Sequence, residues 1–387
     1  MGTDVNTVMF SAIRAAFGDR FLNESEKSFC AEPDKLKELF QIAKKHDIAH
    51  LVAYGLAKTG AVQKNQVSDI MMPAVFRYET QNYEFTRICD ALENAQIVFV
   101  PLKGSVIRSM YPEPWMRTSC DIDILVKKDN LKDAIRCLVD NLEYVEKETN
   151  EYDVSLFTPG GIHVELHFEL IDECVSQKIT EVLGEVWMHT SPKNGFSYWY
   201  EMSDEMFYCF HIAHMAKHFE IGGCGVRPFI DLWILDNINN VSWEKRDKLL
   251  EKGNLSKFCG RARLLSRIWL ENAEYDALSI KLQNYILTGG VYGTVENKVL
   301  AQQQKKGSKL RYVLSRIFLP YSVIKLHYPI LQKHRWLTPV MQVRRWFKLL
   351  FHGVSKDTVE ELRQNSNISK EEADAMNILM KEIGLKN

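Results

Sequence analysis

Three short segments decide the fold: Leu102-Lys-Gly-Ser105, Asp121-Ile-Asp-Ile-Leu-Val126 and His163-Val-Glu-Leu-His167. The second alternates acidic and apolar residues, which predicts a strand with Asp121 and Asp123 on one face and apolar side chains on the other. Side chains two residues apart on a strand are separated by about 6–7 Å. Two carboxylates at that distance repel one another, so the pair indicates a cation between them.

The third segment adds a third carboxylate. Glu165 stands between the apolar residues Val164 and Leu166 on a predicted strand, so it faces the polar side with His163 and His167. Three carboxylates on one sheet face form an oxygen-rich site of the kind that suits Mg²⁺ or Mn²⁺.

The first segment ends a short apolar run that begins at Ile97, and it predicts a turn from a strand into a helix. At such a turn, Gly104 and Ser105 offer backbone N–H groups and a hydroxyl to phosphate oxygens. Lys103 and Arg117 are candidates to contact phosphate, although each could equally be a surface charge. A strand, this turn, the acidic pair and a third acid, in that order, favour phosphoryl or nucleotidyl transfer.

The order of these motifs resembles that of the nucleotidyltransferase superfamily, which includes DNA polymerase beta and kanamycin nucleotidyltransferase. Residues from about 97 to 235 are more closely similar to an uncharacterised bacterial nucleotidyltransferase family within it. The resemblance lies in LKGSVIRSMYP, RTSCDIDILV, VELHFEL and a later histidine-rich helix with His211, His214 and His218. Two features depart from the wider superfamily: 15 residues separate Ser105 from Asp121, and Lys103 replaces the usual apolar residue.

The resemblance implies an enzyme that uses two Mg²⁺ ions and transfers NMP from an NTP, such as ATP, to a hydroxyl or phosphate of an unidentified acceptor. It places Gly104 and Ser105 on the phosphate-binding turn, and Asp121 and Asp123 at the Mg²⁺ (or Mn²⁺) site. Glu165 becomes the third metal ligand and the candidate general base.

The surrounding sequence predicts an α+β fold. Residues 1–95 show helical periodicity, including a helix capped by Asp34 and another over about 67–94. Residues 96–202 alternate strands and helices and form the predicted nucleotidyltransferase domain, with a mixed sheet like the polymerase beta palm. Within it, Asp129 is the predicted cap of a helix, and Thr158-Pro-Gly-Gly161 predicts a hairpin turn.

Residues 203–387 form a second predicted helical region. Ser203 opens a helix on which His211, His214 and His218 share one face. These histidines could be hydrogen-bonded core residues, could line a substrate cleft, or could bind zinc, for which a fourth ligand is missing. Arg227 and Asp231 are expected to form a structural ion pair on the next helix.

A basic segment lies near the end of the chain. Residues 297–356 contain 13 Lys or Arg and no Asp or Glu, although the whole chain has a net charge of −1. This segment predicts helices broken at Pro320, Pro329 and Pro339, and Ser369-Lys-Glu-Glu372 is a capping box for a last helix. The segment could be a solvated face, or it could bind RNA, another polyanion or an anionic membrane surface.

The composition is that of a globular protein, with 46% hydrophobic and 26% charged residues in 387. Eight scattered cysteines without a CxxC motif argue against a zinc ribbon or a disulfide framework. The sequence shows no signal peptide and no apolar run of about 18 residues, so we expect a cytoplasmic protein without a transmembrane segment.

Two other functions remain open at this point. The chain could be a catalytically silent nucleotidyltransferase fold that only binds nucleotide, or a helical protein that acts through its basic segment. The intact set of three acids argues against a silent site, because a costly carboxylate cluster is typical of functional sites.

Overall fold

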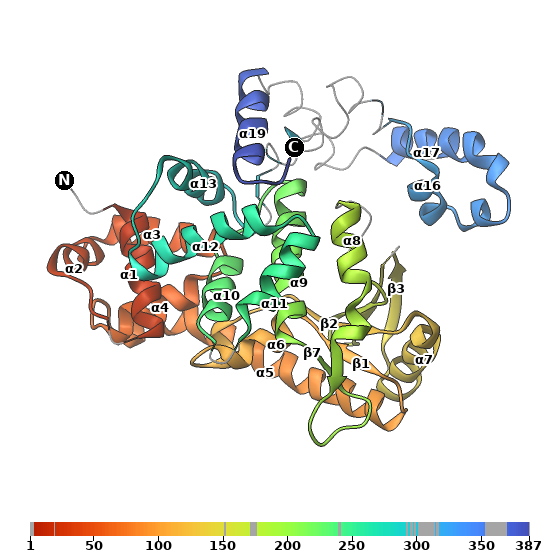
Figure 1. Ribbon diagram of the computed structural model, residues 1–387, viewed down its shortest axis with the longest axis horizontal. Coiled ribbons are helices and arrows are strands. Elements are labelled where there is room, and N and C mark those ends of the chain that lie inside the picture. Colours follow the sequence, from red (N-terminus) through yellow and green to blue (C-terminus); the bar gives the residue numbers. More distant parts are fainter. Residues whose placement is uncertain are drawn as a thin grey trace.

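The computed structural model describes residues 4–18, 20–150, 152–170, 176–238, 241–291, 293–294, 297, 299–300, 314, 317–352 and 370–386. The fold is α+β, with a five-stranded mixed sheet flanked by helices (Figure 1). Across the sheet, the strand order is β1 (Phe99–Pro101), β2 (Asp121–Val126), β5 (His163–His167), β4 (Asp153–Phe157) and β3 (Val145–Thr149).

The sheet has one apolar and one polar face. β2 pairs with β5 in parallel, whereas the other neighbouring strands are antiparallel. On the apolar face, Ile122, Ile124, Val164 and Leu166 are fully buried against α5 (Lys64–Asn94) and α7 (Leu131–Leu142). Because side chains alternate along a strand, burial of these residues turns the acidic residues to the opposite face.

Further helices come before and after the sheet strands along the chain. Before it come α1 (Val5–Phe17), α2 (Glu24–Ala31), α3 (Pro33–Lys45) and α4 (Ala49–Lys58). After it come α8 (Gln177–Gly184), α9 (Asp204–Ile221), α10 (Arg227–Asp236), α11 (Trp243–Lys252), α12 (Ser256–Glu271), α13 (Ala277–Thr288), α16 (Tyr321–His327), α17 (Thr338–His352) and α19 (Lys370–Glu382). Figure 1 shows α5 and α7 beneath the sheet and α8 and α9 above it.

The two helical regions share one buried core. The ring of Phe10 in α1 stacks on that of Trp269 in α12, with 4.6 Å between centroids. Arg14 donates a hydrogen bond of 2.8 Å to the Trp269 carbonyl. Segments distant in the sequence therefore hold one another in place, and the boundaries at residues 95 and 203 stay predictions.

Several predicted elements are confirmed with small changes at their ends. The hairpin turn at 158–161 joins β4 to β5, and Ser203 caps α9 through its side chain. The predicted cap at Asp34 is wrong, because Pro33 already occupies the first turn of α3. The predicted cap at Asp129 is also wrong, because a 3-10 turn over Lys128–Asn130 precedes α7.

The predictions for the C-terminal region are confirmed in part. α16 begins after Pro320, and a 3-10 helix begins at Pro329. Pro339 does not break a helix; it lies in the first turn of α17, where a missing N–H costs nothing. Ser369 lies outside the described residues.

Three strands have no counterpart in the sequence prediction. Every residue of the edge strand β3 is exposed and most are charged or polar, so it lacks the alternating pattern of a half-buried strand. β6 (Thr190–Pro192) and β7 (Tyr200–Met202) form a short two-stranded ribbon beside β1. Each has only three residues, too few to show a period.

Within the described residues, none of the helices has the length and apolarity needed to cross a bilayer. The seven cysteines in the described part are free thiols, and all but Cys120 are buried.

A Cβ atom on Gly55 of α4 would stand 1.9 Å from the carbonyl oxygen of Ala12 in α1. Gly55→Ala should therefore force these helices apart and lower the free energy of unfolding by about 1–3 kcal/mol, measured by urea denaturation. Gly260→Ala in α12 is the matched control, because its Cβ would meet open space. It should stabilise the protein by about 0.5–1 kcal/mol, and a Gly55→Ala variant of parental stability would contradict the close packing.

Candidate active site

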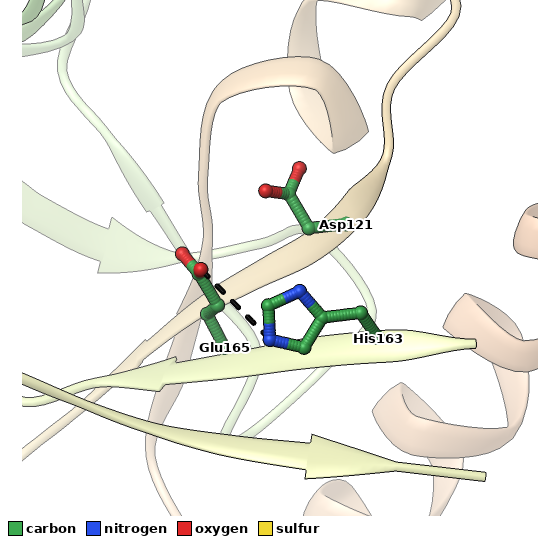
Figure 2. A group of neighbouring side chains, drawn as sticks. All are labelled: Asp121, His163 and Glu165. Carbon is green, nitrogen blue, oxygen red and sulfur yellow. Dashed lines mark ion pairs between the residues drawn. The ribbon is translucent and has the colours of Figure 1, made fainter. Parts of the chain in front are cut away.

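The candidate catalytic residues stand in rows across the sheet. Parallel pairing places Asp121 opposite His163 and Asp123 opposite Glu165, and Glu165 in turn lies opposite Ser155 of β4. Residues opposite one another on neighbouring strands share a face, so all five side chains project to the polar side. Figure 2 shows Asp121, His163 and Glu165 gathered there.

Asp123 is the buried centre of this cluster. Its side chain is 4% exposed, and its Oδ1 accepts a 2.6 Å bond from Lys103 Nζ and a 2.8 Å bond from His167 Nε2. Burial acts to raise the pKa of Asp123, but Lys103 and His167 outweigh it and hold that pKa well below its usual range. Burial acts to lower the pKa of Lys103, but Asp123, Asp121 and Glu165 together raise it, so the lysine stays an ammonium ion.

Asp121 and Glu165 form the more open part of the cluster. Burial and the neighbouring Asp123 raise the pKa of Asp121 to about 6, although Lys103 opposes this. Glu165 Oε2 lies 3.2 Å from His167 Nε2, and its Oε1 lies 3.9 Å from His163 Nε2. Asp121 is thus a carboxylate that a nearby cation would stabilise.

The side chains fit a divalent cation. Ligand atoms of Asp121, His163 and Glu165 lie within 4.8 Å of one another, as do those of Asp123, Glu165 and His167. Carboxylate oxygens are the ligands that Mg²⁺ and Mn²⁺ prefer. Glu165 therefore lies where it could share a cation with Asp121 or with Asp123.

The predicted phosphate-binding turn begins α6 (Lys103–Ile107). A Cβ on Gly104 would stand 3.2 Å from that of Ser119, so a larger residue would have to push the Ser119 side chain aside. The buried Arg108 guanidinium donates 2.8 Å bonds to the Gly104 carbonyl and to Ser119 Oγ. Gln81 Nε2 of α5 donates to the Ser119 carbonyl at 3.0 Å.

Arg108, Ser119 and Gln81 hold this turn and were not predicted from the sequence. They follow no sequence pattern, because their partners lie on separate elements. His163 was not among the predicted site residues either, although the alternation with Glu165 and His167 places it on the same face.

Arg117 has a structural partner. Its Nε donates to Asp231 of α10 at 2.8 Å, and one Nη donates to the Thr118 carbonyl. Tyr111 also donates to Asp231, at 2.6 Å. The predicted ion pair between Arg227 and Asp231 is therefore wrong, because Asp231 is turned into the interior toward Arg117.

Arg227 pairs instead with a residue from the N-terminal region. Its Nη1 lies 2.7 Å from Asp47 Oδ2, and Thr118 Oγ1 donates to the same oxygen at 2.9 Å. This network joins the loop after α3 to α10, a contact between segments 180 residues apart that spacing along one helix could not reveal.

The histidines of α9 face the same cavity as the acids. His211 Nε2 is 2.9 Å from the Pro228 carbonyl, and the rings of His214 and His218 meet edge to face at 4.5 Å. Burial, with Lys103 and Lys217 nearby, lowers the pKa of His218 to about 4. Burial also lowers the pKa values of His211 and His214, so all three are neutral imidazoles near pH 7.

Zinc binding by this stripe finds no support in the described part of the chain. The two groups of side chains placed to hold a metal are those of the sheet, and neither includes a histidine of α9.

A family model described as "Uncharacterised nucleotidyltransferase" matches residues 32–271. The chain belongs to this nucleotidyltransferase family. No curated protein and no solved structure matches it. The match extends beyond the predicted central domain into the helices on both sides, so those helices are part of what the family shares.

A cavity of about 330 Å³ is lined by both the acidic sheet face and the helices opposite. Its lining includes Lys103, Gly104, Arg117, Asp121, Asp123, Glu165, His167, His211, His214 and His218. Ser105 lies on the same turn but not in that lining. The volume falls in the range of about 300–1,000 Å³ that is typical of small-molecule sites.

The basic segment at residues 297–356 lies partly outside the described residues. Its described helices α16 and α17 form a small core of their own around Ile324, Leu331 and Met341. Trp336, Val340 and Phe347 are exposed. Binding of a polyanion or an anionic membrane there stays a prediction.

We expect Asp231→Ala to leave the Arg117 guanidinium buried without its partner. Loss of one member of a buried pair costs about 3–5 kcal/mol, which chemical denaturation should detect as a lower free energy of unfolding. Glu244→Ala is the control, because Glu244 and Lys248 form a fully exposed pair on α11. Its effect should be much smaller than that of Asp231→Ala, and equal effects of the two substitutions would contradict a structural role for Asp231.

Proposed function

We propose that this protein is a metal-dependent nucleotidyltransferase that transfers NMP from an NTP to a hydroxyl or phosphate of an acceptor, with pyrophosphate as the leaving group. One observation carries the proposal: parallel pairing of β2 with β5 brings Asp121, Asp123 and Glu165 together at a cavity. Family membership supports the same reaction.

The metal in this proposal is Mg²⁺ or Mn²⁺, held in the complex with nucleotide by Asp121, Asp123 and Glu165. A divalent cation stabilises the charge that develops on the phosphate oxygens during transfer. Lys103, Gly104, Ser105 and Arg117 are the proposed contacts of the triphosphate. The bond between Arg117 and Asp231 limits Arg117 to contacts through its remaining N–H groups.

Glu165 is the proposed general base. It would take the proton from an acceptor hydroxyl, whose oxygen then bonds to the α-phosphorus while the bond to the pyrophosphate oxygen breaks. Its side chain is 22% exposed, whereas that of Asp123 is 4% exposed, so Glu165 is the more accessible of these two acids.

The helix side of the cavity is the proposed acceptor side. His211, His214 and His218 present neutral imidazoles there, opposite the acids. Neutral imidazoles can donate and accept hydrogen bonds, which suits a polar acceptor. Reduced cysteines agree with the proposed cytoplasmic location.

Metal should stabilise the fold through the acid cluster. At 100 times its dissociation constant, Mg²⁺ should raise the free energy of unfolding by about 2.7 kcal/mol, and Asp121→Asn with Asp123→Asn should abolish that increase. Asp129→Asn with Asp133→Asn, two exposed acids outside the cluster, is the control and should keep it. An increase that persists in the first double variant would place the metal elsewhere.

Catalysis should depend on the carboxylate of Glu165. Glu165→Gln keeps the volume but loses the base, so transfer should slow by about 10²–10⁴-fold. The measurement is transfer of label from each α-labelled NTP, with Mg²⁺ or Mn²⁺, to components of a cell extract. Glu169→Gln, two residues beyond β5 and half exposed, is the control. Full activity of Glu165→Gln would remove it from the mechanism, and no transfer by the parent with any NTP would favour a silent binding module.

A further inference from the structure

Lys103 carries a positive charge into the centre of the acidic cluster. Its Nζ lies 2.6 Å from Asp123 Oδ1, and its side chain is 22% exposed. The residue has a φ of +44°, a left-handed conformation that costs energy in a long side chain. Such strain persists only where the surroundings maintain it, and here the bond to Asp123 holds the side chain in place.

One of the two carboxylate oxygens of Asp123 is already occupied. Its Oδ1 already accepts bonds from Lys103 and from His167, and its side chain is almost fully buried. To bind a second cation there, the ammonium ion would have to leave a buried ionic contact, which is costly. The Asp123 side of the cluster is therefore neutralised by the chain itself.

The Asp121 side of the cluster differs in its charge balance. No ammonium or guanidinium group lies within 4.0 Å of the Asp121 or Glu165 carboxylate among the described residues, and His163 stands beside both. The His163 ring stacks on Phe157 at 4.5 Å, and its Nε2 lies 3.1 Å from Ser155 Oγ. These two contacts fix the ring, and when Nε2 donates to Ser155, Nδ1 keeps the lone pair that a metal needs.

We propose that Lys103 is a tethered cation that fills the Asp123 side of the cluster. The chain without nucleotide then binds one divalent cation, through Asp121, Glu165 and a ring nitrogen of His163. This nitrogen makes the site favour Mn²⁺ over Mg²⁺, because Mg²⁺ demands oxygen ligands and imidazole suits transition metals. The inference concerns the cluster on which the proposed function rests, but it is tested with the metal alone.

The experiment counts Mn²⁺ ions bound per chain, from the electron paramagnetic resonance signal of free Mn²⁺ in a titration without nucleotide. We expect one ion for the parent and for Lys103→Arg, which keeps a cation. Lys103→Met removes the charge at similar length and should admit a second ion. Two ions bound by the parent, or one ion bound by a folded Lys103→Met variant, would overturn the tethered-cation role.

The second part of the experiment tests His163. Calorimetric titrations should show Mn²⁺ binding at least about tenfold more tightly than Mg²⁺, and His163→Gln should remove most of this preference. His189→Gln, a histidine on a separate part of the chain, is the control and should keep it. Equal affinities in the parent, or an unchanged preference in His163→Gln, would overturn His163 as a ligand.

The two proposals fail separately. A parent that binds one Mn²⁺ ion but transfers no nucleotide would leave the metal assignment standing and reject the proposed function. Nucleotide transfer by a parent that binds two Mn²⁺ ions would support the proposed function and reject the tethered-cation role of Lys103. Thermal unfolding of each variant shows whether it is folded, and the ion count of the parent decides the first point even if Lys103→Met does not fold.

Discussion

The site depends on one backbone interaction, the parallel pairing of β2 with β5. It brings acids that are 42 residues apart in the sequence into one row, Asp123 opposite Glu165. The apolar residues between them fix the register, since a shift by one residue would turn Ile122 and Ile124 toward the cavity and the acids into the core. The hydrophobic core beneath the sheet and the charge cluster above it are thus two results of the same alternation.

One buried and one partly buried ionic contact hold the opposite wall of the cavity over this face. Arg117, just before β2, binds Asp231 of α10, and Arg227 at the start of α10 binds Asp47 from the N-terminal region. Both contacts join segments that lie far apart in the chain. The helices on either side of the sheet are therefore needed to complete the cavity, which agrees with a family match that includes them.

The two walls of the cavity differ in their electrostatics. The sheet side concentrates carboxylates whose repulsion is offset by Lys103 and His167, and burial together with Asp123 still raises the pKa of Asp121. The helix side presents imidazoles that burial keeps neutral. A cation bound on the sheet side and a polar acceptor on the helix side would face one another across a space the size of a small-molecule site.

The sequence by itself determined the α+β class, the strand with Asp121 and Asp123, the hairpin that leads to Glu165 and the direction in which these acids point. Each follows from a local period or a local turn signal, which a few neighbouring residues contain. Only the tertiary structure decided the partners of the charged side chains: Lys103 with Asp123, Arg117 with Asp231, and Arg227 with Asp47. The prediction for Arg227 was wrong because spacing along a helix shows only which residues of that helix can meet. Asp231 is instead turned into the interior, where the buried guanidinium of Arg117 needs a carboxylate partner. The exposed strand β3 was missed for a related reason: its neighbour in the sheet, and not its own side chains, makes it a strand.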